Sequence, residues 1–96
     1  MAAPKKIKKK IFRFYGLYNN IHIGPKIHLD GVKIIIHEQP AINLNEAFEL
    51  YKLHLIGNVG VSNADIDQYL IDLYYQSIKV EIIEGDSVTF DEIPLI

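Results

Sequence analysis

Hydrophobic and polar residues alternate along the first part of the chain in a way that predicts β-strands. Residues 11–18 (IFRFYGLY) are rich in aromatic and aliphatic side chains and predict a first strand, closed by a turn at Asn19-Asn20. Residues 26–29 and 32–37 flank Asp30-Gly31, a preferred sequence for a two-residue hairpin turn. Such a turn would place on one buried face the side chains of Ile27, Leu29, Val32, Ile34 and Ile36.

The middle of the chain changes to the helical period of 3.6 residues. Asn43 can cap a helix that runs to about Ile56 and that Gly57 would end. Its buried stripe would be formed by Leu44, Ala47, Phe48, Tyr51 and Leu55. Ser62 and Asp65 resemble a capping box and open a second expected helix, to about Ser77. The core stripe of that helix would hold Ile66, Tyr69, Leu70, Leu73 and Tyr74.

Alternation returns near the C-terminus, where residues 79–84 and 87–92 flank a turn at Gly85-Asp86. These elements together predict an α+β fold, in which a small antiparallel sheet is covered on one face by a helical hairpin. The sheet would contain the N-terminal strand, the Asp-Gly hairpin and the C-terminal hairpin. We expect one domain over residues 11–96, preceded by a basic arm over residues 1–10 and ending in an apolar tail, residues 93–96.

The composition narrows the class of protein. With 96 residues, 49% hydrophobic and 23% charged, the chain has the profile of a small globular domain. It contains no cysteine, which excludes disulfides, thiolate zinc sites and thiol catalysis. Its apolar runs never exceed three residues, so we expect neither a transmembrane segment nor export by a signal peptide.

Charge is segregated along the chain although the formal net charge is only −2. Seven cations and no acid precede Asp30, whereas residues 62–96 hold eight acids and a single cation, Lys79. Such a distribution, with a positive head and a negative tail half, suits contacts in which opposite charges on two subunits steer each other into register.

Few residues have the spacing that reaction chemistry needs. The four histidines lack the spacing of a metal site: His28 and His37, placed on one hairpin face, would lie roughly 13 Å apart along the strand. Asp65 and Asp72 fit a solvated helix face better than an acid–base pair. Residues 57–60 (GNVG) could seat a phosphate but lack the lysine of a P-loop. We therefore expect no enzyme activity, no metal, no cofactor and no small-molecule substrate.

Two surfaces are instead expected to bind partners. The first is the basic arm, whose cations could contact protein or nucleic acid, and it consists of Lys5, Lys6, Lys8, Lys9, Lys10 and Arg13. The second is a set of apolar residues outside the predicted core stripes, formed by Leu53, Ile56, Ile71, Tyr75, Ile78, Leu95 and Ile96. The alternatives are that the arm is a solvated tail or a nuclear localisation patch, and that the apolar residues pack under the terminal strands.

These features favour a non-enzymatic assembly protein that docks onto like or unlike protein subunits and has no contact with a membrane. Its small size, its lack of cysteine and its 17 isoleucines and nine lysines, which have AT-rich codons, suit an auxiliary capsid or connector-type subunit of a virus or bacteriophage particle, located in the virion and assembled in the host cytoplasm. The alternative is a ribosomal-type nucleic-acid-binding protein that uses the basic arm. A third hypothesis, an inhibitor that mimics nucleic acid with its acidic half, is weakened by the dispersed acids.

Overall fold

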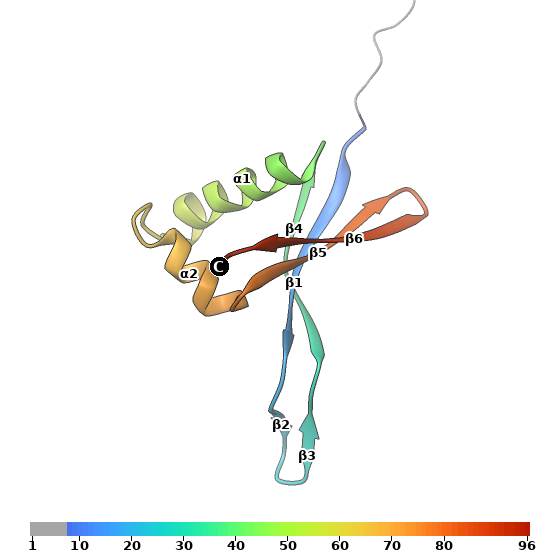
Figure 1. Cartoon of the computed structure of the whole chain (residues 1–96), viewed down its shortest axis with the longest axis vertical. Helices are drawn as coiled ribbons and strands as arrows, with labels where there is room; N and C mark the ends of the chain where they lie inside the picture. The colour runs from blue at the N-terminus through green and yellow to red at the C-terminus, as the bar shows by residue number, and fades with distance from the viewer. Residues whose placement is uncertain (1–7) are drawn as a thin grey trace, which may run out of the picture.

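The structure is a computed structural model that describes residues 8–96. Its main sheet has four antiparallel strands in the order β4-β1-β5-β6. The strands are β1 (Lys10–Tyr18), β4 (Val32–Ala41), β5 (Ser77–Glu84) and β6 (Ser87–Pro94). Two short strands, β2 (Ile21–Ile23) and β3 (Ile27–Leu29), form a separate two-stranded ribbon that projects from one end of the sheet (Figure 1).

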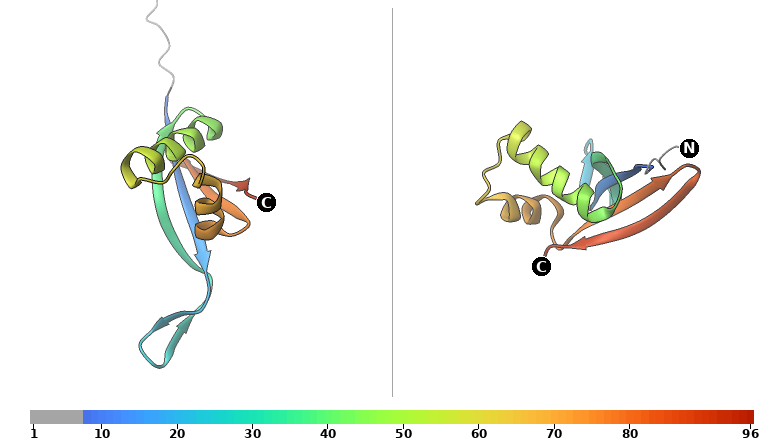
Figure 2. Two further views of the ribbon diagram at one scale, coloured as in Figure 1. Left: turned by 90° about the vertical axis from the view of Figure 1, so that its left-hand side faces the viewer. Right: turned by 90° about the horizontal axis from the view of Figure 1, so that it is seen from above.

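The helices lie together on one face of the sheet (Figure 2). Helix α1 (Leu44–His54) begins at Asn43, whose side-chain oxygen accepts a hydrogen bond from the Glu46 N–H at 2.8 Å, as an N-cap should. It continues as a π-helical turn, η1 (Leu55–Val59), and ends at Gly60, which adopts φ 87°. The expected end at Gly57 is therefore wrong, by three residues.

Ser62 and Asp65 bond to each other, but in a turn that precedes helix α2 (Ile66–Tyr74). The expected start of the helix at Ser62 is therefore wrong, because Asp65 is the N-cap residue. The helix is shorter than expected, because the chain leaves it at Tyr75 with φ 68° and enters β5 at Ser77. A hydrogen bond connects the end of α2 to β1, because the Tyr18 hydroxyl donates to the Leu73 carbonyl at 3.0 Å.

The core lies between the helices and the sheet, and aromatic rings occupy its centre. Phe14 stacks on Tyr51 with the ring centroids 4.9 Å apart, and Tyr51 shares a 2.7 Å hydrogen bond with the buried Tyr74 hydroxyl. Burial raises the pKa of both tyrosines above the ordinary value. The remaining buried side chains around them are Phe12, Ala41, Ala47, Leu55, Ile66, Leu70, Ile78, Val80 and Ile93.

The α+β fold is confirmed, but the position of the first hairpin turn is wrong. Asp30-Gly31 is not a chain reversal; it lies opposite Asn19-Asn20 within one long hairpin that turns at residues 24–26. One register runs from the Tyr15–Ile35 pair to the Ile23–Ile27 pair. Pairing with β1 over its whole length decides between the two turns, since it satisfies far more backbone groups than the short hairpin would.

The predicted buried face of this hairpin is consequently wrong as well. Ile27, Leu29 and Ile34 are exposed, and of the five residues only Ile36 packs against the core. Ile36 is the extra residue of a β-bulge, because Phe14 pairs with His37 and Tyr15 with Ile35. The bulge reverses the alternation along β4, so no single period-2 pattern describes this strand.

Candidate protein-interaction surface

The projecting ribbon carries an uncovered aliphatic face. Antiparallel pairing joins Ile21 to Leu29 and Ile23 to Ile27, and paired residues share a face. We call these four residues the ribbon face. Ile23 and Ile27 are 55% and 52% exposed, and no helix or second sheet covers them. This surface therefore departs from the rule that rows of aliphatic side chains are buried.

The ribbon is joined to the sheet by a defined kink. The Asn19 side-chain oxygen accepts the Gly31 N–H at 2.8 Å, and the Asp30 carboxylate accepts the Asn20 N–H at 2.9 Å. Asn20 and Gly31 both have positive φ, 59° and 68°, which these two residue types tolerate. The kink is thus hydrogen-bonded across both strands at the base of the ribbon.

A second uncovered surface is the sheet face that the helices do not cover, which we call the open sheet face. Strand pairing places Tyr15, Lys79 and Glu92 in one row across it, and Arg13, Glu81 and Phe90 in the next. Its exposed apolar side chains are Leu17, Ile35, Val88 and Phe90, of which Phe90 is 66% exposed. Apolar patches of this kind on a small domain are typical of protein interfaces.

Ion pairs fill the centre of the open sheet face. Arg13 lies 3.2 Å from Glu38 and 3.6 Å from Glu81, and Lys33 donates to Glu81 at 2.6 Å. The Lys33 ammonium also lies 4.5 Å from the centre of the Tyr15 ring. The hydrogen bond from Lys33 holds the pKa of the Glu81 carboxyl below its usual value.

The cations of the expected basic arm fall into three groups in the structure. Lys5 and Lys6 lie outside the described residues, and Lys8 and Lys9 are exposed. Lys10 and Arg13 belong to β1 and pair with carboxylates of the same chain, Lys10 with Glu84 at 3.5 Å. Of the seven cations that precede Asp30, Lys10 and Arg13 are thus paired with carboxylates on the strands beside β1.

The expected outer stripe of the second helix does not exist. Ile78 lies on β5 and is fully buried, so its expected place on an exposed helix face is wrong. Ile71 is half-buried on α2, and Tyr75 follows the helix and is 64% exposed. The prediction continued the helical period past Tyr75, where a positive φ turns the chain toward the sheet.

The other apolar candidates do not gather into one patch with the ribbon face. Leu53 on α1 and Ile96 at the C-terminus are 62% and 87% exposed. Ile56 and Leu95 are partly buried and pack against the core, as the alternative interpretation of these residues expected. The sequence reasoning missed the ribbon face, although the mirrored run IHI-GPK-IHL, residues 21–29, is the signal that could have found it.

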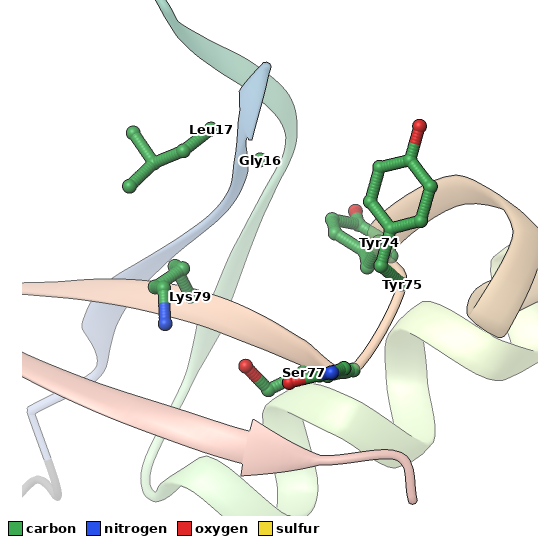
Figure 3. Close-up of a pocket in the computed structure, with 7 residues that line it drawn as sticks. Gly16, Leu17, Tyr74, Tyr75, Ser77 and Lys79 are labelled. Carbon is green, nitrogen blue, oxygen red and sulfur yellow. The ribbon is translucent and has the colours of Figure 1, made fainter. Parts of the chain in front are cut away.

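A shallow hollow of about 420 Å³ lies where β5 leaves α2 beside β1 (Figure 3). Gly16, Tyr74 and Lys79 are among its lining residues, and the Tyr75 ring points away from the strands at its rim. The hydroxyl of Ser77, also on its wall, donates to Glu92. A serine held by a carboxylate, with no histidine in the lining, is not an activated nucleophile.

Three further observations concern the described part of the chain and its likeness to other proteins. Within residues 8–96, no group of three or more histidine, cysteine or acidic side chains is gathered around a metal-ion position. In the same residues, neither helix has the length and apolar character needed to cross a membrane. Comparison of the chain with protein-family models, curated proteins and solved structures finds no match.

Proposed function

We propose that this protein is a non-enzymatic structural protein that assembles with further copies of itself, and that the ribbon face is the surface that is covered on assembly. One observation carries the proposal: a two-stranded ribbon extends beyond the body with its aliphatic side chains in solvent. An isolated two-stranded hairpin is marginally stable in water. A ribbon with such a face therefore gains stability from whatever protein surface packs against it.

The gain from covering the ribbon face is substantial on the scale of association energies. Complete burial of an isoleucine or leucine side chain is worth about 1.5–3 kcal/mol, so each half-exposed residue can contribute about 1 kcal/mol. The exposed side chains of the open sheet face add to this, since one contact can extend from the ribbon to Leu17 and Ile35. A stable interface covers about 800 Å² on each partner, so we expect the contact to include part of the open sheet face as well as the ribbon face.

Charge complementarity favours a second copy of the same chain as the occupant. Residues 8–41 carry six cations and two acids, whereas residues 43–96 carry two cations and ten acids. Lys26 at the ribbon tip forms no ion pair within the described residues, and neither do Asp65, Asp67 and Asp72 on and before α2. A head-to-tail contact can bring the tip of one copy to the acidic helix of the next.

More specifically, we propose that the protein is an accessory subunit of a virus or bacteriophage particle, with an auxiliary capsid or connector-type role. It is supported by the small cysteine-free chain and by a protruding ribbon that suits contact with neighbouring subunits. The ribosomal-type alternative has less support, because carboxylates of the same chain pair with Lys10, Arg13 and Lys33 and would compete with phosphates for these cations.

Measurement of particle mass by light scattering tests the proposal. We expect the purified protein to have a mass that is a multiple of 11.0 kDa. The double variant Ile23→Asn/Ile27→Asn should be monomeric, because it makes the ribbon face polar. The matched control Val59→Asn changes a residue that is equally exposed, at 52%, but lies in η1, and it should assemble normally. A wild-type protein that stays monomeric at millimolar concentration would contradict self-assembly.

A further inference from the structure

The two edges of the four-stranded sheet differ in the features that prevent pairing with a further strand. At one edge, β4 carries Lys33, Pro40 and a β-bulge, and each of these is an obstacle to the addition of another strand. At the other edge, β6 has no lysine, no proline and no bulge from Ser87 to Ile93. Within residues 8–96, β5 is the only strand that pairs with β6. The outer edge of β6 is therefore open to a strand of another molecule.

The backbone groups on the outer side of β6 belong to alternate residues. In an antiparallel pair, every second residue exchanges both hydrogen bonds with its partner strand, and the residues between them point their N–H and C=O groups away from it. The Leu95 N–H donates to the Gln76 carbonyl at 2.8 Å, so the odd-numbered residues bond toward β5. The outward residues are therefore Val88, Phe90 and Glu92. The Asp91 carboxylate accepts the Glu92 N–H at 2.7 Å, and the other two outward N–H groups remain for a further strand.

The sequence of this edge favours antiparallel pairing with itself, centred on Phe90. This register pairs the whole segment 87–93 and places Pro94, which has no N–H, beyond the ladder and opposite the turn of the partner copy. It places Asp91 opposite Thr89, so no two carboxylates face each other. A ladder centred on Asp91 would bring two like charges directly opposite each other, which is destabilising. A ladder centred on Thr89 would pair only five residues of β6 in each copy.

The exposed apolar side chains of β6 gain neighbours in this arrangement. Val88 and Phe90 are 49% and 66% exposed, and both lie on the open sheet face. A two-fold axis through the centre of the ladder keeps the open sheet faces of both copies on the same side. The two Phe90 side chains then lie directly opposite each other, and aromatic pairs across two strands stabilise their association.

We propose that β6 is a second contact between copies of the chain, which pairs edge to edge with β6 of another copy to form one eight-stranded antiparallel sheet. The inference rests on the proposed function, because the edge by itself offers few hydrogen bonds and a small apolar area. Copies that the ribbon face already holds together meet at a high effective concentration, at which such a contact can form.

The chain contains no cysteine, so introduced cysteines report this register by disulfide cross-linking. The test mixes Thr89→Cys and Asp91→Cys in equal amounts and oxidises the mixture. Residue 89 of one copy and residue 91 of the other would lie about 4.5 Å apart at Cα, within reach of a disulfide. The two copies of residue 89 would lie about 7–8 Å apart, beyond that reach. We expect the mixture to give several times more cross-linked dimer on a non-reducing gel than either variant alone.

Both substituted residues are exposed, so the core stays intact, and Leu53→Cys is the matched control. Leu53 is 62% exposed but lies on α1, so it should cross-link to either β6 variant only at the low level of random collisions. Equal cross-linking of the control, or no mixed cross-link in protein that light scattering shows to be assembled, would overturn this contact alone. A protein that is monomeric in light scattering would contradict self-assembly and this contact together.

Discussion

Isoleucine has opposite environments in the two regions of this molecule. In the body, Ile78 is completely buried between the sheet and the helices, whereas Ile27 on the ribbon is half exposed. Both residues lie on strands that pair antiparallel with a neighbour, and both have hydrophobic cross-strand partners, Ile93 and Ile23. What differs is the layer above them: the body has helices, and the ribbon has none. The body therefore buries its isoleucines in a two-layer core, whereas the ribbon leaves its aliphatic side chains exposed.

Matched isoleucine substitutions give the largest expected difference between the two regions. Ile78→Ala removes buried methyl groups and leaves a cavity, so the free energy of unfolding should fall by about 2–5 kcal/mol. Ile27→Ala should change it by less than about 0.5 kcal/mol in dilute monomeric protein, because the side chain is already half exposed. Urea denaturation of both variants measures the two values. Equal losses would show that the ribbon is packed against the body.

A smaller effect within the body concerns the hydrogen bond between Tyr51 and Tyr74. Tyr74→Phe leaves the buried Tyr51 hydroxyl without its partner and should lower the free energy of unfolding by about 1–2 kcal/mol at neutral pH. The control Tyr75→Phe changes a tyrosine that is 64% exposed and should have no measurable effect.

The same pair predicts a pH dependence. Burial raises the pKa of Tyr51 and Tyr74 in the folded protein, while the unfolded chain loses these protons near pH 10. Above that pH the folded state binds more protons than the unfolded state, so stability is fully present below pH 10 and falls as the pH rises further. Tyr74→Phe should make this fall shallower, and an unchanged slope in alkaline urea titrations would contradict the assignment.

Capping and turn residues in the sequence predicted those helix ends and turns that depend on neighbouring residues. The Asn43 cap and the hairpin around Gly85 are both present, because each depends on bonds between residues close in the chain. The bonds between Ser62 and Asp65 also form, but they lie in a turn before the second helix and do not open it. The first hairpin was predicted wrongly, since Asp30-Gly31 satisfies the local rule for a turn and Gly24-Pro25 also permits one. Only the long-range pairing of β1 with β4 decides between them.

The ribbon face could not be predicted either, because it also depends on the long-range pairing of the first hairpin. In the wrong register Ile27 and Leu29 belong to a core face and His22 has no histidine opposite it. In the observed register Ile23 lies opposite Ile27, and His22 lies opposite His28. Ile78 is buried because α2 ends before it, at Tyr75, where φ is positive. Aromatic residues rarely adopt a positive φ, and no periodic pattern in the sequence indicates one.

The most direct test of the central claim, that the ribbon face is covered by another copy of the chain, is amide hydrogen exchange at residues 21–29 over a range of protein concentrations. We predict that protection of the ribbon amides rises with concentration in the wild-type protein and does not rise in Ile23→Asn/Ile27→Asn. Amides of the body, such as those of Phe14 and Val80, should be protected at every concentration. Fast exchange of the ribbon at all concentrations, beside a protected body, would contradict the claim.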